Sequence, residues 1–391
     1  MAIDNETFSI LRSSVQRFVL ERLIPAEDAV EENDAVPSEI VAELKELGMF
    51  GLTIPEEYGG IGLTMEQECL VIYDISHAAF AFRSTFGTNV GIGSQGILMD
   101  GTEEQKEFWL PKFATGEITI SFALTEPDVG SDAASIKTRA VEDGDHYIIN
   151  GTKRFITNAP TAGAFTLMAR TGEAGAKGIS AFVIMADTPG ITIGKPDKKM
   201  GQRGALTSDV IFENVRVSKD SIIGGVPGKG FYTAMKVLDR GRLHIAAQAV
   251  GMADRLIRDA VQYAKERQQF GQPIANFQLI QGMLADSQTE LFAAKSMLLE
   301  SARMYDQNPR GKRNNALSMA AASTKLFCTE MVGRVADRAV QIHGGAGYIS
   351  EYKVERFYRD VRLLRLYEGT SEIQKIIIAK HLLARDENEK F

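Results

Sequence analysis

The chain has 391 residues, of which 44% are hydrophobic and 24% charged, and its formal net charge at pH 7 is −7. This length exceeds one ordinary hydrophobic core and indicates a globular protein of two or three domains. The acidic balance argues against a nucleic-acid-binding surface. Two distant cysteines, Cys69 and Cys328, and five scattered histidines suggest neither a disulfide framework nor a metal site.

The beginning of the sequence is acidic and has no apolar core of a signal peptide. No apolar run is long enough to cross a bilayer. We therefore expect a cytoplasmic protein that has no membrane segment.

Residues 1–118 favour helices, because apolar residues recur at steps of three and four from Phe8 to Val19 and from Ile40 to Leu47. The helix that starts at Ser38 is expected to end at Gly48, a typical C-terminal cap.

The pattern changes near Thr119. Runs rich in β-branched and aromatic residues cover residues 119–124, 146–157, 179–186 and 208–217. Within the second run, Asn150-Gly151 predicts a hairpin turn. Residues 119–229 therefore predict an all-β domain, a barrel or a sandwich.

Residues 230–391 return to long amphipathic helices, with apolar faces over 246–264, 280–304 and 317–339. Short connections between such helices indicate a bundle. The predicted fold is mainly α with a middle β domain, divided into residues 1–118, 119–229 and 230–391.

A short stretch near the end places Glu368 just before a predicted helix. Ser371 and Gln374 fit a capping box with serine as the N-cap, and Gly369 allows a sharp turn before it. Taken alone, these residues are explained most simply by a surface glutamate that favours the helix dipole.

Two glycine-rich stretches fail the common nucleotide-binding motifs. In residues 224–230, Ile223 stands where a phosphate loop needs its first glycine, and Gly230 stands where it needs Ser or Thr. Residues 344–347 lack the third glycine of a dinucleotide fingerprint and a surrounding βαβ unit. A nucleotide cofactor would therefore be held in another way.

Six separated stretches together resemble the acyl-CoA dehydrogenases, and the resemblance covers nearly the whole chain. They are residues 124–132 (LTEPDVGSD), 155–158 (FITN), 239–242 (DRGR), 266–271 (ERQQFG), 341–348 (QIHGGAGY) and 367–374 (YEGTSEIQ). The resemblance implies a helical N-terminal domain, a middle β domain and a C-terminal four-helix bundle, assembled as a homotetramer that binds FAD. It implies no metal.

The resemblance also assigns FAD contacts, some of them reaching across a subunit interface. The matching positions are Leu124, Thr125, Gly130, Ser131, Phe155, Thr157, Arg267, Gln269, Phe270, Gln341, Gly344, Gly345, Thr370 and Glu372. Thr125 is expected near flavin N5, and Arg267 suits the pyrophosphate. The ordinary alternatives are a solvated charge for Arg267 and a core side chain for Phe155.

The implied reaction converts an acyl-CoA to a trans-2-enoyl-CoA and passes the electrons to an electron-transfer flavoprotein. Glu368 would remove the α-proton while flavin N5 takes the β-hydride, and enclosure should raise the pKa of this carboxylate. The Glu368 backbone N–H and a flavin hydroxyl would stabilise the enolate. Some relatives carry the base near Asp239, but the matching position here is Gly241.

The implied substrate contacts are Ser131, Asp239, Arg242, Tyr367, Gly369 and Arg83. Arg83 stands where glutaryl-CoA dehydrogenases carry an arginine for the distal carboxylate, which suggests a dicarboxylyl-CoA as an alternative substrate. The acidic partner that those enzymes place upstream is Ser76 here. Arg83 could instead pair with a structural carboxylate or lie on the surface.

Two further alternatives remain. An acyl-CoA oxidase of the same fold would use oxygen directly, although the chain length favours the dehydrogenase. A non-enzymatic acyl-CoA-binding protein belongs to a different class, and the presence of Glu368 argues against it.

Overall fold

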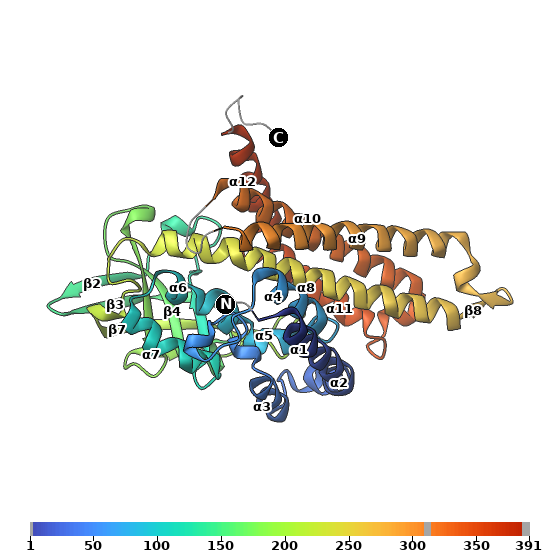
Figure 1. Ribbon diagram of the computed structural model, residues 1–391, viewed down its shortest axis with the longest axis horizontal. Helices are drawn as coiled ribbons and strands as arrows, with labels where there is room; N and C mark the ends of the chain where they lie inside the picture. The colour runs from blue at the N-terminus through green and yellow to red at the C-terminus, as the bar shows by residue number, and fades with distance from the viewer. Residues whose placement is uncertain (1–2, 309–313, 385–391) are drawn as a thin grey trace.

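The N-terminal part of the computed structural model, which describes residues 3–308 and 314–384, is helical as expected (Figure 1). Its α-helices are α1 (Asn5–Phe18), α2 (Ile24–Asn33), α3 (Ser38–Glu46), α4 (Met65–Ile75), α5 (Phe80–Thr88), α6 (Gln95–Asp100) and α7 (Glu103–Ala114). Gly48 closes α3 with a φ of 71°, which confirms the predicted cap. A π-helical turn, Asn89–Gly93, joins α5 to α6.

The middle part is built on one seven-stranded sheet. Its strands are β1 (Ile120–Ala123), β2 (Arg139–Asp143), β3 (His146–Thr157), β4 (Ala164–Arg170), β5 (Ile179–Met185), β6 (Ile191–Ile193) and β7 (Thr207–Ser218). They are ordered β1-β4-β2-β3-β7-β6, and β5 pairs with β4. Parallel pairing of β1 with β4 interrupts an otherwise mainly antiparallel sheet.

The predicted Asn150-Gly151 turn is wrong. β3 passes straight through these residues, and its register against β7 shifts there, which marks a bulge. The hairpin turn lies earlier, at Gly144, whose φ is 58°. Gly144 and Asp145 form the two-residue loop between β2 and β3, where Asp143 pairs with His146.

The C-terminal part consists of long helices that run side by side (Figure 1). They are α8 (Gly230–Glu266), α9 (Gln278–Asp306) and α10 (Asn315–His343), followed by α11 (Val354–Val361) and α12 (Ser371–Leu383). A small hairpin, β8 (Gln268–Gln269) and β9 (Gln272–Pro273), caps the far tip. Helix α12 projects from the body at the top of the view, near the middle of the molecule (Figure 1). The domain limits 118/119 and 229/230 remain predictions.

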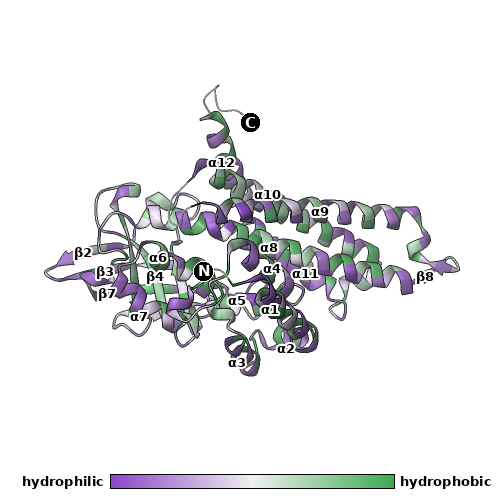
Figure 2. Cartoon of the chain, viewed as in Figure 1, coloured by the Kyte–Doolittle hydropathy of each residue, from purple (hydrophilic) through white to green (hydrophobic). Residues whose placement is uncertain are grey.

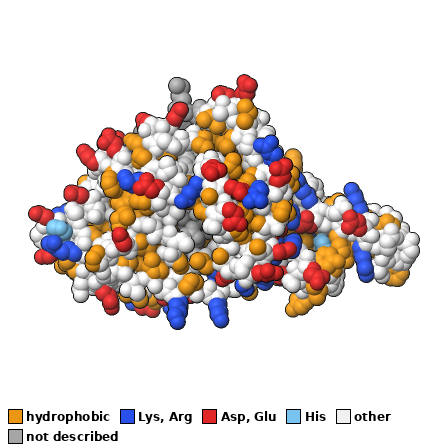
Figure 3. Space-filling view, turned by 90° about the horizontal axis from the view of Figure 1, so that it is seen from below, with side chains coloured by type: hydrophobic (Ala, Val, Ile, Leu, Met, Phe, Trp, Pro, Cys, Tyr) orange, Lys and Arg blue, Asp and Glu red, His pale blue; other side chains and the backbone are white. Residues whose placement is uncertain are grey.

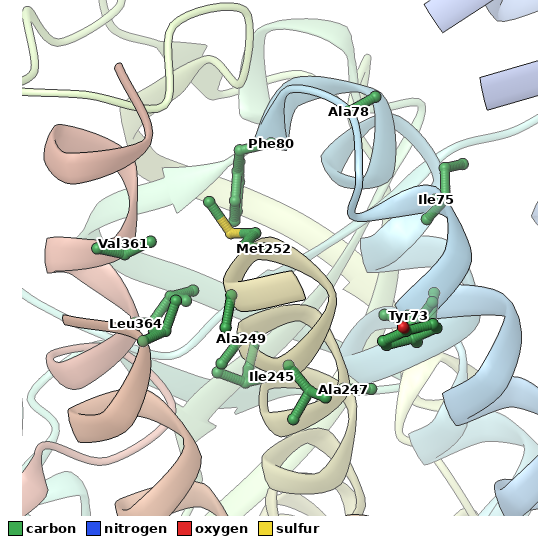
Figure 4. Close-up of a cluster of buried hydrophobic side chains, with 14 of the residues drawn as sticks. Tyr73, Ile75, Ala78, Phe80, Ile245, Ala247, Ala249, Met252, Val361 and Leu364 are labelled. Carbon is green, nitrogen blue, oxygen red and sulfur yellow. The ribbon is translucent and has the colours of Figure 1, made fainter. Parts of the chain in front are cut away.

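Helix α8 runs through the centre of the helical packing and contacts helices on both of its sides. Small residues such as Ala247 and Ala249 let α4 and α5 approach it on one side and α11 on the other (Figure 4). Phe80 and Met252 fill the space between these helices. Close packing of this kind leaves few routes by which a polar side chain inside α8 could reach water.

The surface carries acidic and basic side chains interspersed with apolar ones (Figure 3). Green and purple alternate along α9 and α10 (Figure 2), and several apolar side chains on α9 and α12 face outward. Leu279 is 84% exposed, Phe292 72% and Leu383 88%. Within the two described ranges, no helix combines the length and the apolar character needed to traverse a bilayer.

Candidate active site

Glu368 lies in the loop between a 3-10 turn, Arg362–Arg365, and α12, with a left-handed backbone at φ 52°. Its Oε2 atom is enclosed and has no hydrogen-bond partner among the described residues. The carboxylate lies against the backbone of Gly241 in α8, so closely that a Cβ atom there would collide with Oε2 and lie 3.0 Å from Cδ. The Gly241 backbone therefore packs directly against this carboxylate and leaves no space for a larger residue.

Three polar contacts hold this strained loop. The Lys325 Nζ atom on α10 donates to the Gly369 carbonyl at 2.8 Å. The Gln374 Nε2 atom donates to the carbonyls of Glu368 at 3.2 Å and Gly369 at 2.9 Å. These bonds offset the cost of a left-handed glutamate, of order 1–3 kcal/mol.

The predicted capping box is wrong, because the N-cap lies one residue earlier and Ile373 then occupies the position that needs Glu or Gln. Thr370 is the N-cap of α12, and its hydroxyl accepts from the Ile373 N–H at 3.3 Å. Ser371 is inside the helix and donates to Glu330 on α10 at 2.6 Å. Gln374 is directed at the Glu368 loop rather than at a cap, because that loop presents two carbonyls to it.

Burial raises the pKa of Glu368, and the positive charges of Arg83, Lys325 and Arg242 oppose that rise. Lys325 is itself fully buried, and burial lowers its pKa to about 8. No described residue accepts a hydrogen bond from the Glu368 backbone N–H. The loop thus presents a basic carboxylate and a free N–H donor from one residue.

Arg83 is only 7% exposed, so the surface position considered for it is wrong. No carboxylate of the described chain lies within 4.0 Å of its guanidinium, which also excludes a structural ion pair there. Its Nη2 atom hydrogen-bonds to His244 Nδ1, and its Nε atom is buried without a partner in the described residues. Burial lowers the pKa of Arg83, and the charges of Tyr367, Glu368 and Glu68 oppose this.

Asp239 and Arg242 lie one turn apart on α8 and form a buried ion pair. The Ser318 hydroxyl on α10 donates to Asp239 at 2.6 Å. Arg242 also contributes to the charge that acts on Glu368. The pair is close to the base, as a substrate-binding role requires.

The β-domain candidates lie in the loop after β1 and at the end of β3. The Leu124 carbonyl accepts from Lys153 Nζ at 2.9 Å, and the Thr125 carbonyl accepts from the Arg154 N–H at 2.8 Å. Thr157 ends β3 and its carbonyl accepts from the Ser121 hydroxyl.

Lys153 also forms a buried ion pair with Glu126 at 2.8 Å. The Glu126 carboxylate accepts in addition from two backbone N–H groups, those of Lys137 and Thr138. This pair fixes the loop that carries Leu124 and Thr125.

Phe155 is 57% exposed and has a φ of 58°, so the core interpretation of this side chain is wrong. The Arg154 guanidinium lies 5.0 Å from the centre of its ring. Gly130 and Ser131 are exposed, and a Cβ atom on Gly130 would meet nothing within 4 Å. These positions are open to a ligand.

The remaining candidates divide between the Glu368 loop and the distant tip of the bundle. Tyr367, Gly369 and Thr370 are partly buried beside Glu368, and Glu372 is exposed in the first turn of α12. The tip holds Arg267, Gln269, Phe270, Gln341, Gly344 and Gly345, all exposed. Phe270 is 92% exposed.

The tip lies far from Glu368 in one chain. Helix α8 separates Gly241 from Arg267 by roughly 39 Å, at about 1.5 Å per residue. The structure therefore does not bring the two groups of candidates together within one subunit.

Sequence reasoning missed four buried charged or polar side chains around the site: Glu68, Arg240, His244 and Lys325. Each interrupts an apolar helix face, as Lys325 does between Ala321 and Cys328. A charged residue in such a position was the available signal, because an unpaired buried charge is too costly to persist.

Comparisons with known proteins agree with this architecture. The acyl-CoA dehydrogenase N-terminal, middle and C-terminal domain models match residues 5–117, 121–215 and 228–383. The chain is 42% identical to the 3-(aryl)acrylate reductase of Clostridium sporogenes, over 97% of this chain and 99% of that protein. It is 40% identical to the caffeyl-CoA reductase-Etf complex subunit CarC of Acetobacterium woodii, over 92% and 93%.

Among solved structures, a glutaryl-coenzyme A dehydrogenase in complex with glutaryl-CoA superposes with a TM-score of 0.92. It is 34% identical, with coverage of 100% of this chain and 98% of that one. Together with the three consecutive domain matches, these similarities show that the chain belongs to the acyl-CoA dehydrogenase family.

Proposed function

We propose that this protein introduces an α,β double bond into an acyl-CoA thioester, with Glu368 as the catalytic base. The observation that carries the proposal is the Glu368 carboxylate, which is enclosed over Gly241 with one oxygen lacking a partner in the described chain. A base needs such a free oxygen to receive the α-proton of a substrate.

Desolvation makes this carboxylate a stronger base than a solvated glutamate, as its raised pKa indicates. The positive charges of Arg83, Lys325 and Arg242 limit the rise and favour the ionised form that a base requires. The rigid contacts of Lys325 and Gln374 with the loop fix the carboxylate before substrate arrives. Such positioning removes part of the entropic barrier.

The thioester oxygen becomes negatively charged as the α-proton leaves, so it needs a hydrogen-bond donor in place. The Glu368 backbone N–H fills this role in the proposal, because no described residue accepts from it. Base and donor then belong to one residue, and the same loop holds both.

Members of the family depend on FAD, and FAD is the cofactor of this protein. When bound, FAD accepts the hydrogen and electron pair that leave the β-carbon. The residues fit this cofactor: Phe155 offers an exposed aromatic ring, and Gly130 leaves open space that a Cβ would occupy. We assign the flavin end to Leu124, Thr125, Phe155 and Thr157, with Ser131 beside the pyrophosphate or substrate.

We assign the exposed tip of the bundle to the FAD of another subunit. Arg267 and Phe270 lie on the β8–β9 hairpin with little covering them, and Gly344 and Gly345 leave room for close approach by a ligand. The homotetramer implied by the family resemblance would bring this tip to a partner's cofactor. Outward-facing apolar side chains on α9 support such an assembly.

Electrons would leave to an electron-transfer flavoprotein, as the name of the Acetobacterium woodii relative suggests for that protein. Two of the relatives are named reductases. The same base and donor serve reduction of a 2-enoyl-CoA in reverse, so the electron partner would set the direction.

The test is an anaerobic panel of acyl-CoA esters added to purified yellow protein. Loss of the flavin colour with a subset of esters, and turnover with an artificial acceptor, would support the proposal. Peroxide release in air at the same rate would identify an oxidase. A protein that binds esters but never loses its colour would be a non-enzymatic binder.

A second candidate substrate, a dicarboxylyl-CoA, is favoured by one observation. Arg83 is a buried cation without a carboxylate partner, and its Nε atom is unpaired in the described chain. A distal carboxylate on the acyl chain would form an ion pair with Arg83 and accept a hydrogen bond from its Nε atom. In Arg83→Ala, we expect turnover of glutaryl-CoA to fall far more than turnover of butyryl-CoA. Equal losses on both esters would refute a carboxylate-binding role.

A further inference from the structure

Arg83 ends a buried chain of four polar side chains drawn from three helices. Arg240 on α8 forms an ion pair with Glu68 on α4. The other Glu68 oxygen lies 3.2 Å from His244 Nε2, and His244 Nδ1 hydrogen-bonds to Arg83 Nη2 on α5. Glu68 is 0% exposed and His244 1%.

The hydrogen-bond directions in this chain follow from its chemistry. A guanidinium can only donate, so His244 Nδ1 must accept from Arg83, which places the remaining His244 proton on Nε2. The Nε2 atom lies 3.2 Å from a Glu68 oxygen, but the two atoms form no hydrogen bond. Burial and the charge of Arg83 lower the pKa of His244 to about 4, so the imidazole is neutral at pH 7.

The charges in the chain are therefore unevenly balanced. Arg240 and His244 hold the pKa of Glu68 below its ordinary value against the effect of burial, so Glu68 is an anion already paired with Arg240. The direct partner of Arg83 is uncharged. A carboxylate in the place of His244 would neutralise the charge of Arg83. The neutral imidazole orients the guanidinium by a hydrogen bond and does not neutralise it.

The backbone also packs closely against both groups. A Cβ atom on Gly87 would lie 3.0 Å from the Arg83 guanidinium, and one on Gly91 would lie 3.4 Å from His244 Nδ1. The approach at Gly87 is tight enough to require glycine beside Arg83, whereas Gly91 lies in ordinary contact with His244. The arrangement is thus specified by four helical segments rather than by one pair.

We propose that His244 and Glu68 are positioning residues that hold the Arg83 guanidinium beside Glu368 with its charge uncompensated. The function of this charge rests on the proposed role of Glu368 as the base. An oriented, uncompensated cation keeps Glu368 ionised and leaves a site for an anionic substrate group. Through this arrangement, Glu68 on α4 influences the reaction although it does not contact Glu368.

Several other charges face the groups invoked here. Arg242 and Arg240 of α8 and Lys325 of α10 act on Glu368, and Tyr367 lies next to it in the chain. Arg83, Glu68 and Arg240 act on His244. Among these charges, Arg83 is the one that hydrogen-bonds to His244, so substitutions at position 244 act on it most directly.

The test compares His244→Asn, whose amide oxygen can replace Nδ1 as the acceptor, with His244→Asp, which places an anion against Arg83. For His244→Asp we expect the acid limb of kcat/KM with butyryl-CoA to move to higher pH, lowering the rate at pH 6 by roughly tenfold, as for about one pKa unit. Selectivity for glutaryl-CoA should fall as well. His244→Asn should recover most of both.

His77→Asn is the matched control, because His77 is another buried histidine paired with a carboxylate, Asp254, at 2.8 Å. It should lower thermal stability without moving the acid limb. If His244→Asp loses stability in the same way but keeps the wild-type pH profile and selectivity, His244 is merely structural and the proposal fails.

A measurement that needs no turnover separates this proposal from the proposed function. ¹⁵N NMR of the histidine rings in the FAD-loaded wild-type protein should show His244 as the neutral Nε2–H tautomer from pH 6 to 9. A charged imidazole at pH 7 would overturn the proposal even in an active enzyme. If no acyl-CoA ester is turned over, the proposed function and the catalytic role of the cation fail together, whatever the tautomer.

Discussion

The region around Gly241 and the tip of the helical bundle differ in whether their polar side chains find partners within the chain. Around Gly241, most charged groups are buried and meet partners within the described chain, whereas a Glu368 oxygen and the Arg83 Nε atom have no hydrogen-bond partner there. At the tip, Arg267, Phe270 and Gly344 are exposed. The polar groups of the first region are thus enclosed by the fold, whereas those of the second face outward, where our proposal places the FAD of another subunit.

The buried region can be tested by filling the space beside the Glu368 carboxylate. In Gly241→Ala, the new methyl group collides with the carboxylate, so we expect kcat to fall by about a hundredfold, the usual cost of displacing a catalytic group by about 1 Å. FAD absorbance and circular dichroism should stay normal. Steady-state kinetics with the best acyl-CoA ester measures the loss.

Gly282→Ala is the matched control, because this glycine lies in α9 and a methyl group added there would meet nothing within 4 Å. It should gain up to about 1 kcal/mol of stability and keep its activity. A Gly241→Ala enzyme as active as this control would mean that the carboxylate need not rest on α8.

Removal of the Lys325 charge should have a smaller effect on activity, and it tests the electrostatic surroundings of Glu368. Lys325→Met keeps the volume but removes the bond to the Gly369 carbonyl and one cation that opposes the raised pKa of Glu368. Because the base acts only when ionised, and activity is lost as pH falls through its pKa, the acid limb of kcat/KM should move upward. We expect roughly a tenfold loss at pH 6, measured as a pH–rate profile. An unchanged profile would show that Lys325 serves packing alone.

The smallest expected effect concerns the tip. Arg267→Ala should leave the folded chain as stable as before, since Arg267 is exposed, but weaken FAD binding by roughly tenfold through loss of one charge-assisted hydrogen bond. Titration of apo-protein with FAD measures this affinity. Arg216→Ala, an exposed arginine on β7, is the control. Equal affinity in both variants would remove the tip from the cofactor site.

Local patterns predicted the long helices and the strands β1, β3, β5 and β7, but they missed β2, β4 and β6. The apolar periodicities of α8, α9 and α10 and the glycine cap of α3 are confirmed. The two local errors, at Asn150-Gly151 and at Ser371, arose where two turn or cap residues lie close together. Pairing with β7 decided the first and the contact with Glu330 the second.

The candidate site was less predictable. The resemblance pointed to Glu368 and Arg83, but Glu68 and His244 lie far apart in the sequence and meet only because α4 packs on α8. Nothing in either local segment specifies the partner. A buried histidine between Leu243 and Ile245 indicates that a partner exists, and only the fold shows which one.

The most direct measurement is anaerobic single-turnover loss of flavin colour in Glu368→Gln, followed by stopped flow with the best acyl-CoA ester. The amide keeps the size of the side chain but cannot take a proton. The account predicts normal FAD content and ester binding, with a rate about four orders of magnitude below that of the wild type. A rate within tenfold of the wild type would contradict Glu368 as the base.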